Sequence, residues 1–265
     1  MSSSGAGGSA AGASGPWSLY ERLLDALPAE AAVRRVLVGR AWTLVEAQGL
    51  GMAMSHDDDE SEASLQPPYA GRPLRQLAAG LRSWNVREAA IGLAAVNSHY
   101  NDRARVEQAF GRRLPERNDE TVFQFLLPEL VGRRVAVIGH FPGLEPLAAR
   151  CRLTILERRP QPGDLPDFAA EYLLPEQDWV FITGVTLVNK TLPRLLELSR
   201  RAKVVLVGPS VPLTPRWFEW GVSVVAGSVA VDPARVWEAA GEGGVRDIWG
   251  RGAVTVQFRA EERPR

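Results

Sequence analysis

The chain has few of the residues that disulfides and metal cages require. Its only cysteine is Cys151, so it can form neither an intramolecular disulfide nor an all-cysteine zinc cage, as suits a reducing cytoplasm. Basic and acidic residues both number 31, so nothing in the net charge attracts a nucleic-acid backbone. No apolar run reaches the ~18–20 residues of a membrane span, and the start lacks the basic and apolar regions of a secretory signal. These absences predict a cytoplasmic protein with neither a nucleic-acid nor a membrane partner.

The composition along the chain predicts two folded parts after a tail. Residues 1–15 are almost entirely Gly, Ala and Ser, which bury too little surface to offset the entropy of ordering, so a disordered tail is expected. Residues 16–117 predict a smaller α+β domain and residues 118–265 an α/β domain with a mostly parallel, Rossmann-like sheet.

The first part shows both helical and strand patterns. Apolar spacing predicts helices over residues 17–27, 73–81 and 86–100, and two strands over 33–45 and 49–55 predict a β-hairpin. The helix over residues 86–100 is small and apolar, which lets it pack closely against a neighbour. Its apolar face is expected to contact either the second domain or another copy of the chain, so a homo-oligomer stays open.

The second part alternates buried strands with helices. Strands are predicted over residues 134–139, 153–157, 178–184, 203–208 and 222–227, with an edge strand over 254–258. Helices are predicted over residues 121–131, capped by Asn118 or Asp119, and over 142–150, 192–199 and 233–240.

Glycine and polar residues follow the predicted parallel strands. Because ligands of open parallel sheets bind at the carboxyl ends of the strands, these residues predict one small-molecule site there. The alternative is that they only make turns and cap helices. The candidate site residues are Gly139, His140, Phe141, Pro142, Gly143, Glu157, Thr183, Gly184, Asn189, Thr191, Gly208, Pro209 and Ser210, with Gly227 and Ser228 at the fifth strand.

Glu157 follows Gly139 by 18 residues, close to the ~20-residue offset at which dinucleotide-binding domains place a ribose-binding acid. The alternative is a surface acid that pairs with Arg158 or Arg159. The stretch GHFPG lacks the full set of glycines of a dinucleotide site, and its histidine and phenylalanine take up the room that a pyrophosphate needs. A standard NAD site is therefore not expected.

The remaining reactive side chains each have two interpretations. His140 could act as an acid or base or bind a transition metal, or it could be structural. His56 with residues 57–60 (DDDE) could hold a hard metal or form a solvated loop. Ser210 lacks the surroundings of a nucleophilic serine, and Cys151 is expected in the core.

Four separated motifs carry a family resemblance. The stretches VAVIGHFPGLEPL, LTILERRP, DWVFITGVTLVNKTL and VVLVGPSVPLTP resemble the putative heavy-metal chelation domain family, long labelled a domain of unknown function. Upstream, VGRAWTLVEAQGLGMA and AAIGLAAVNSHYN resemble its companion domain, which is similar to the N-terminal domain of enolase. The resemblance implies that most of the candidate site residues fall on family motifs. Lys190 stands where a small residue is expected and would bring a positive charge to the site rim.

Three functions follow as hypotheses. The first is a cytoplasmic protein that binds a small molecule at the strand ends, with a link to heavy-metal handling that the resemblance implies. The second is an enzyme acting on an adenosine-containing, pterin-like or metallophore-type compound, with Glu157 gripping hydroxyls and His140 as acid or base. The third is a direct metal-binding protein using His140, with His56 and its neighbouring acids.

Overall fold

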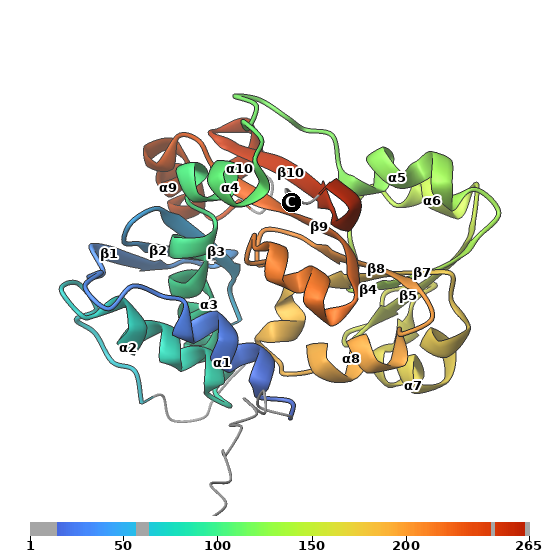
Figure 1. Cartoon of the computed structure of the whole chain (residues 1–265), viewed down its shortest axis with the longest axis horizontal. Helices are drawn as coiled ribbons and strands as arrows, with labels where there is room; N and C mark the ends of the chain where they lie inside the picture. Colours follow the sequence, from blue (N-terminus) through green and yellow to red (C-terminus); the bar gives the residue numbers. More distant parts are fainter. Residues whose placement is uncertain (1–14, 57–63, 245–246, 263–265) are drawn as a thin grey trace, which may run out of the picture.

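The N-terminal part is a three-stranded antiparallel sheet with helices packed on it (Figure 1). The computed structural model describes residues 15–56, 64–244 and 247–262, so residues 1–14 of the predicted tail and residues 57–60 of the acidic run lie outside the described part. The elements are α1 (Ser18–Asp25), β1 (Arg35–Val38), β2 (Trp42–Glu46), β3 (Leu50–Met54), α2 (Leu74–Ala78), a 3-10 helix (Ala79–Arg82), α3 (Val86–Tyr100) and α4 (Arg103–Phe110).

The predicted hairpin is a three-stranded meander. The apolar run that predicted one strand over residues 33–45 contains a reversal, in which the Gly39 N–H donates to the Trp42 carbonyl at 2.9 Å. Apolar residues on both sides concealed this turn. Helix α4 was not predicted because it is rich in charge, although Asp102 caps its start and Gly111, with φ 63°, ends it.

The C-terminal part is built on a seven-stranded sheet in the order β10-β9-β8-β7-β4-β5-β6. All its neighbouring strands are parallel except β9 and β10. The prediction of an α/β chain, with a large, mostly parallel sheet after a smaller α+β part, is confirmed. The strands are β4 (Arg134–Ile138), β5 (Arg152–Glu157), β6 (Leu165–Pro166), β7 (Trp179–Thr183), β8 (Lys203–Val207), β9 (Val222–Ala230) and β10 (Ala253–Arg259).

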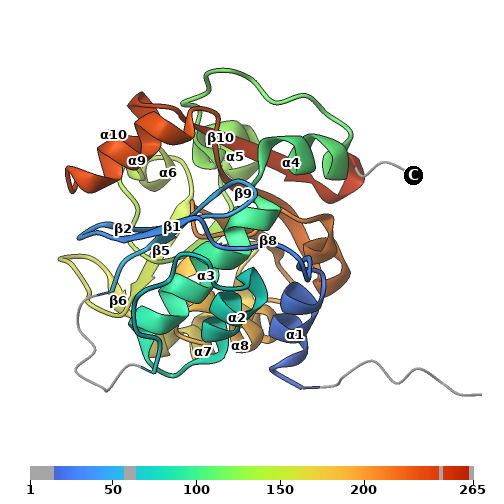
Figure 2. The same cartoon turned by 90° about the vertical axis from the view of Figure 1, so that its left-hand side faces the viewer.

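Helices cover both faces of the large sheet (Figure 2). One face packs on α5 (Val122–Leu130) and α6 (Glu145–Ala148), and the other on α7 (Ala170–Leu173) and α8 (Leu192–Leu198). Helices α9 (Pro233–Gly241) and α10 (Asp247–Gly250) instead pack on the small sheet, on the face opposite α3 (Figure 1). Further 3-10 helices cover Asp167–Ala169, Leu174–Glu176, Gly184–Leu187, Pro215–Trp220 and Ala260–Glu262. No helix in the described ranges has the length and apolar character that crossing a bilayer demands.

Three predicted boundaries in this part were wrong. Helix α5 is capped by Thr121, which forms a reciprocal capping box with Gln124, and not by Asn118 or Asp119. Helix α6 begins at Glu145 and not at Pro142, because Gly143 turns the chain with a φ of 77°. Residues 227–228 do not end a strand, since β9 continues to Ala230 in its pairing with β10.

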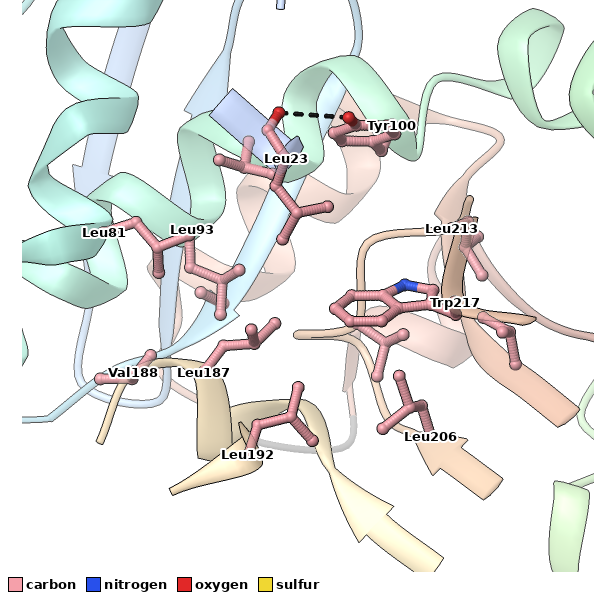
Figure 3. Packing of buried hydrophobic residues seen from close by; sticks show 14 of the residues in the cluster. Leu23, Leu81, Leu93, Tyr100, Leu187, Val188, Leu192, Leu206, Leu213 and Trp217 are labelled. Atoms are coloured by element: carbon pink, nitrogen blue, oxygen red, sulfur yellow. Dashed lines mark hydrogen bonds between the residues drawn. The ribbon is translucent and has the colours of Figure 1, made fainter. Parts of the chain in front are cut away.

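The two parts share one core (Figure 3). Leu23 and Leu93 from the N-terminal helices lie in the same cluster as Leu187, Leu206 and Trp217 from the C-terminal part. Buried Asn101 at the end of α3 adds polar contacts to the loop after β8: it donates to the Val211 carbonyl at 3.0 Å and accepts from the Leu213 N–H at 2.8 Å. The small sheet is thereby fixed beside the carboxyl ends of the large sheet. The apolar face of α3 is used within the chain, while a boundary at residue 117 and a homo-oligomer stay predictions.

Candidate functional site

The carboxyl ends of the parallel strands open into a cleft at the point where the strand order reverses. Strand β4 pairs with β5 on one side and with β7 on the other, so the loops after β4 and β7 leave in different directions. The cleft has a volume of about 1550 Å³, and we call it the strand-end cleft. Most of the sequence-predicted residues line it: Gly139, His140, Phe141, Pro142, Gly143, Glu157, Thr183, Asn189, Thr191, Gly208 and Pro209.

Gly184 and Ser210 are not among the lining residues. A Cβ on Gly184 would lie 2.6 Å from the Ser210 carbonyl carbon, so this glycine permits close packing of two loops. The Ser210 side chain is buried, and its hydroxyl accepts from the Met54 N–H at 3.0 Å. Ser210 therefore ties the large sheet to the small one.

The Phe141 ring covers the strand ends. It packs edge-on against Phe123, with ring centroids 5.4 Å apart. A Cβ on Gly139 or Gly208 would lie 3.4 Å or 3.8 Å from the ring, and both glycines have positive φ. In a dinucleotide site the backbone of this loop contacts the pyrophosphate. Here the ring stands in its way, which agrees with the incomplete fingerprint in the sequence, and it gives the cleft an aromatic floor.

Glu157 bonds to backbone amides and not to arginine side chains. One carboxylate oxygen accepts from the His140 N–H at 2.9 Å, and the other accepts from the N–H groups of Arg158 at 2.8 Å and Arg159 at 3.2 Å. The carboxylate thus joins the loop after β4 to the loop after β5. Glu157 also lines the strand-end cleft, so this role in the fold is compatible with a ligand contact.

Replacing Glu157 with alanine is expected to lower the free energy of unfolding by about 1 kcal/mol, because three amides lose a charged acceptor. Urea unfolding of the variant and the native protein measures the difference. Glu145→Ala is the matched control, since Glu145 lines the same cleft and its side chain makes no hydrogen bond or ion pair within the described ranges. Equal stability of the two variants would contradict the role assigned to the three amide bonds.

His140 is held by a carboxylate that sequence reasoning missed. Its Nδ1 lies 2.8 Å from Oδ2 of Asp164, whose side chain is only 2% exposed, whereas the His140 side chain is 32% exposed. The same oxygen accepts from the Gln161 N–H at 3.0 Å. The only local signal was a PGD turn, in which Gly163 has a φ of 98°. Nothing in the sequence places that turn beside His140.

The loop after β7 combines cleft lining with turn formation. Oδ1 of Asn189 accepts from the N–H and the hydroxyl of Thr191 at 3.1 Å and 2.6 Å, so it forms a turn before α8, and no side chain caps that helix. Lys190 is not among the lining residues, so its expected charge at the rim is not found. Its ammonium donates to the Val188 carbonyl at 2.6 Å, and burial lowers the pKa of Lys190 to about 8.

Part of the cleft wall comes from segments that the sequence did not connect with the site. The small sheet contributes Trp42 and Met54, and the start of α3 contributes Val86. Phe168, which is 72% exposed, and Trp249 come from the C-terminal part. The cleft therefore lies between the two parts of the chain and is not confined to the large sheet.

The described residues do not fit a metal cage made by the protein alone. Across residues 15–56, 64–244 and 247–262, no group of three or more His, Cys, Asp or Glu side chains could hold an ion. His56 lines the cleft and its Nδ1 lies 3.1 Å from the Met54 carbonyl oxygen, but the acids after it lie outside the described part. The Cys151 thiol donates to the Leu147 carbonyl at 3.0 Å, and burial raises its pKa.

Known proteins resemble the chain over nearly its whole length. Two family models, both described as putative heavy-metal chelation, match residues 20–100 and 121–257. An uncharacterized protein of Methanocaldococcus jannaschii is 27% identical over 205 residues, which are 72% of this chain and 75% of that protein. A crystal structure of a protein with unknown function from Desulfitobacterium hafniense belongs to the family of the second model. It is 36% identical to this chain and has a TM-score of 0.84. The match covers 92% of this chain and 98% of that one. Another from Pyrococcus horikoshii, at 18% identity, has a TM-score of 0.75 over 91% and 98% of the two chains and supports the fold alone.

Proposed function

The chain belongs to the putative heavy-metal chelation family, and from this premise we propose that it binds a small organic molecule in the strand-end cleft. In this proposal the protein works in the cytoplasm, and heavy metal reaches it as a complex with that molecule. The observation that carries the proposal is a cleft of about 1550 Å³ at the strand-order reversal, walled by both parts of the chain. The lack of a protein-only metal cage in the described ranges supports the arrival of the metal as a complex with the small molecule.

The lining of the cleft favours a planar, partly polar ligand of the adenosine or pterin type. Phe141 offers an aromatic surface on which a flat heterocycle can stack. Thr183 and Asn189 bring hydrogen-bonding groups to the wall, and Glu157 brings a carboxylate that could accept from ligand hydroxyls. A flat ring with polar edges satisfies both features, whereas a purely apolar ligand would leave the polar groups without partners.

The first test is the mass of whatever co-purifies with the protein under native conditions, together with thermal shifts in adenosine and in a soluble pterin. We expect Phe141→Ala to weaken binding of the responding compound by about tenfold or more, because stacking on an aromatic side chain contributes roughly 1–3 kcal/mol. Phe125→Ala is the matched control, since Phe125 is a half-buried ring on α5 that packs under Arg259 and does not line the cleft.

Two results would contradict the proposal. One is a native mass equal to the bare chain together with no thermal shift in either compound. The other is binding that responds equally to Phe141→Ala and to Phe125→Ala, since the ligand would then lie outside the strand-end cleft.

A further inference from the structure

The His140 imidazole is fixed on one side and open on the other. A carboxylate can only accept a hydrogen bond, so Nδ1, which faces Asp164 at 2.8 Å, carries the ring proton. In the neutral ring this proton position leaves Nε2 with its lone pair. The backbone is fixed as well, because the His140 N–H donates to Glu157 at 2.9 Å. Both the tautomer and the direction of the ring are therefore set by the protein.

The open nitrogen belongs to a residue of the cleft wall. No protein group in the described part of the chain bonds Nε2 of His140. The residue lines the strand-end cleft, and its side chain is 32% exposed, while its partner Asp164 is 2% exposed. The lone pair is thus available to an occupant of the cleft, and the carboxylate behind it is shielded from water.

A neutral histidine with a carboxylate on its second nitrogen is the arrangement that proteins use for metal ligands, because the carboxylate fixes the ring and raises its basicity. A general base takes its proton from a bound substrate, from water or from a protein hydroxyl beside it. Two threonine hydroxyls of the cleft wall already have protein partners: Thr183 accepts from the Val185 N–H, and Thr186 donates to the Thr183 carbonyl. The carboxylate on Nδ1 is the feature that favours coordination of a metal by the other nitrogen.

A single nitrogen cannot hold a metal ion tightly by itself. No group of three or more His, Cys, Asp or Glu side chains is placed to do so within the described ranges. The other donors must come from the ligand, for which the cleft has room at about 1550 Å³.

We propose that Nε2 of His140 is the one protein donor to a transition metal that enters the strand-end cleft already bound to an organic chelator. Asp164 is the positioning residue for this donor. The inference rests on the proposed function, in which the chelator is the small molecule that the cleft binds. It goes further by naming the coordinating atom, the residue that fixes it and the class of ligand, a chelate with one open coordination position.

Binding of the Cu²⁺–iminodiacetate complex tests the proposal, because iminodiacetate supplies three donors and leaves an equatorial position for one imidazole. The full chain with His56→Gln is the starting protein, so that the other cleft histidine does not contribute. Titration calorimetry gives the stoichiometry and affinity, and electron paramagnetic resonance shows whether an added nitrogen binds the copper. We expect one equivalent to bind, His140→Gln to abolish it, and Asp164→Asn to weaken it about 10–100-fold.

Asp167→Asn is the matched control, because Asp167 lines the same cleft but pairs with Arg158 at 3.2 Å and does not bond His140 in the described structure. It is expected to change the affinity less than twofold. Absence of binding, binding that survives His140→Gln, or equal effects of the two aspartate variants would each overturn the proposal. If adenosine or pterin binding persists and still depends on Phe141, the proposed function stands while this inference fails. Metal-free conversion of such a compound that requires His140, with no copper bound, would also overturn it and favour an enzyme.

Discussion

Replacing Gly92 with alanine is expected to lower the free energy of unfolding by about 3 kcal/mol or more, although alanine is a better helix former than glycine. Gly92 lies in the middle of α3, and a Cβ built on it would stand 2.0 Å from the backbone nitrogen of Leu81 and 2.6 Å from the carbonyl carbon of Gly80. Both atoms belong to the backbone of the neighbouring 3-10 helix, so no side-chain rotation relieves the clash. One of the two helices must move, which disrupts the core between them.

The experiment is urea unfolding of the variant beside Gly241→Ala. Gly241 is also a helical glycine, the last residue of α9, but a Cβ there would meet no atom within 4 Å and its φ is not positive. Gly241→Ala is therefore expected to be neutral or to stabilise the fold by up to about 1 kcal/mol. Similar stabilities for the two variants would show that close packing of α3 is not what Gly92 provides.

The same close packing positions one wall of the cleft. On the other side of α3, a Cβ on Gly51 of β3 would lie 2.0 Å from the Ala94 carbonyl oxygen, so the strand lies directly on the helix. Strand β3 ends at Met54, which lines the strand-end cleft and whose N–H donates to Ser210. The small residues of α3 and β3 thus set how near the small sheet comes to the large one.

Local patterns in the sequence were enough to predict most of the large sheet. The apolar β-branched runs at β4, β7 and β8 predicted buried parallel strands because each run is short and followed by glycine or by a polar residue and glycine. The run of small, apolar residues at α3 predicted a closely packed helix, because small side chains let two backbones approach each other. The prediction of one strand over residues 33–45 was wrong, because apolar residues flank the chain reversal at Gly39 on both sides and make the run look continuous.

The sequence predicted those site residues that directly follow the end of a parallel strand. His140, Phe141 and Glu157 follow directly from the convergence of parallel strands, and all three line the cleft. Asp164 was missed because its bond to His140 joins residues 24 positions apart through a loop with no periodic pattern. Ser210 was expected at the site; its hydroxyl accepts from the Met54 N–H, 156 positions away, and it does not line the cleft. The Met54–Ser210 contact depends on how the two parts of the chain dock, and the Asp164–His140 contact depends on the path of a loop; periodicity carries no information about either.

The pH dependence of stability is expected to be governed in part by His99, a buried residue near the end of α3 that does not line the strand-end cleft. Its Nδ1 lies 2.9 Å from Oε1 of Gln48 in the turn between β2 and β3. Burial, together with the positive charge of Arg105, lowers the pKa of His99 to about 4, although Asp102 opposes the shift. In the folded protein the ring therefore stays neutral at pH values where the unfolded chain, with an ordinary pKa near 6.5, already binds a proton.

The sign follows from this difference in proton uptake. Stability is fully present above about pH 6.5, falls as the pH drops towards about 4, and levels off below both values. At 1.36 kcal/mol per pKa unit the whole effect is about 3 kcal/mol, of which about 2 kcal/mol is lost between pH 7 and pH 5, before most carboxylates titrate. Urea unfolding at these two pH values should show this loss of stability in the native protein. The control variant His56→Gln should show it as well, because His56 is partly exposed in the native protein. In His99→Gln the difference between the two pH values should nearly vanish. If that variant loses as much stability as the native protein, the proton is taken up elsewhere and His99 does not limit acid stability.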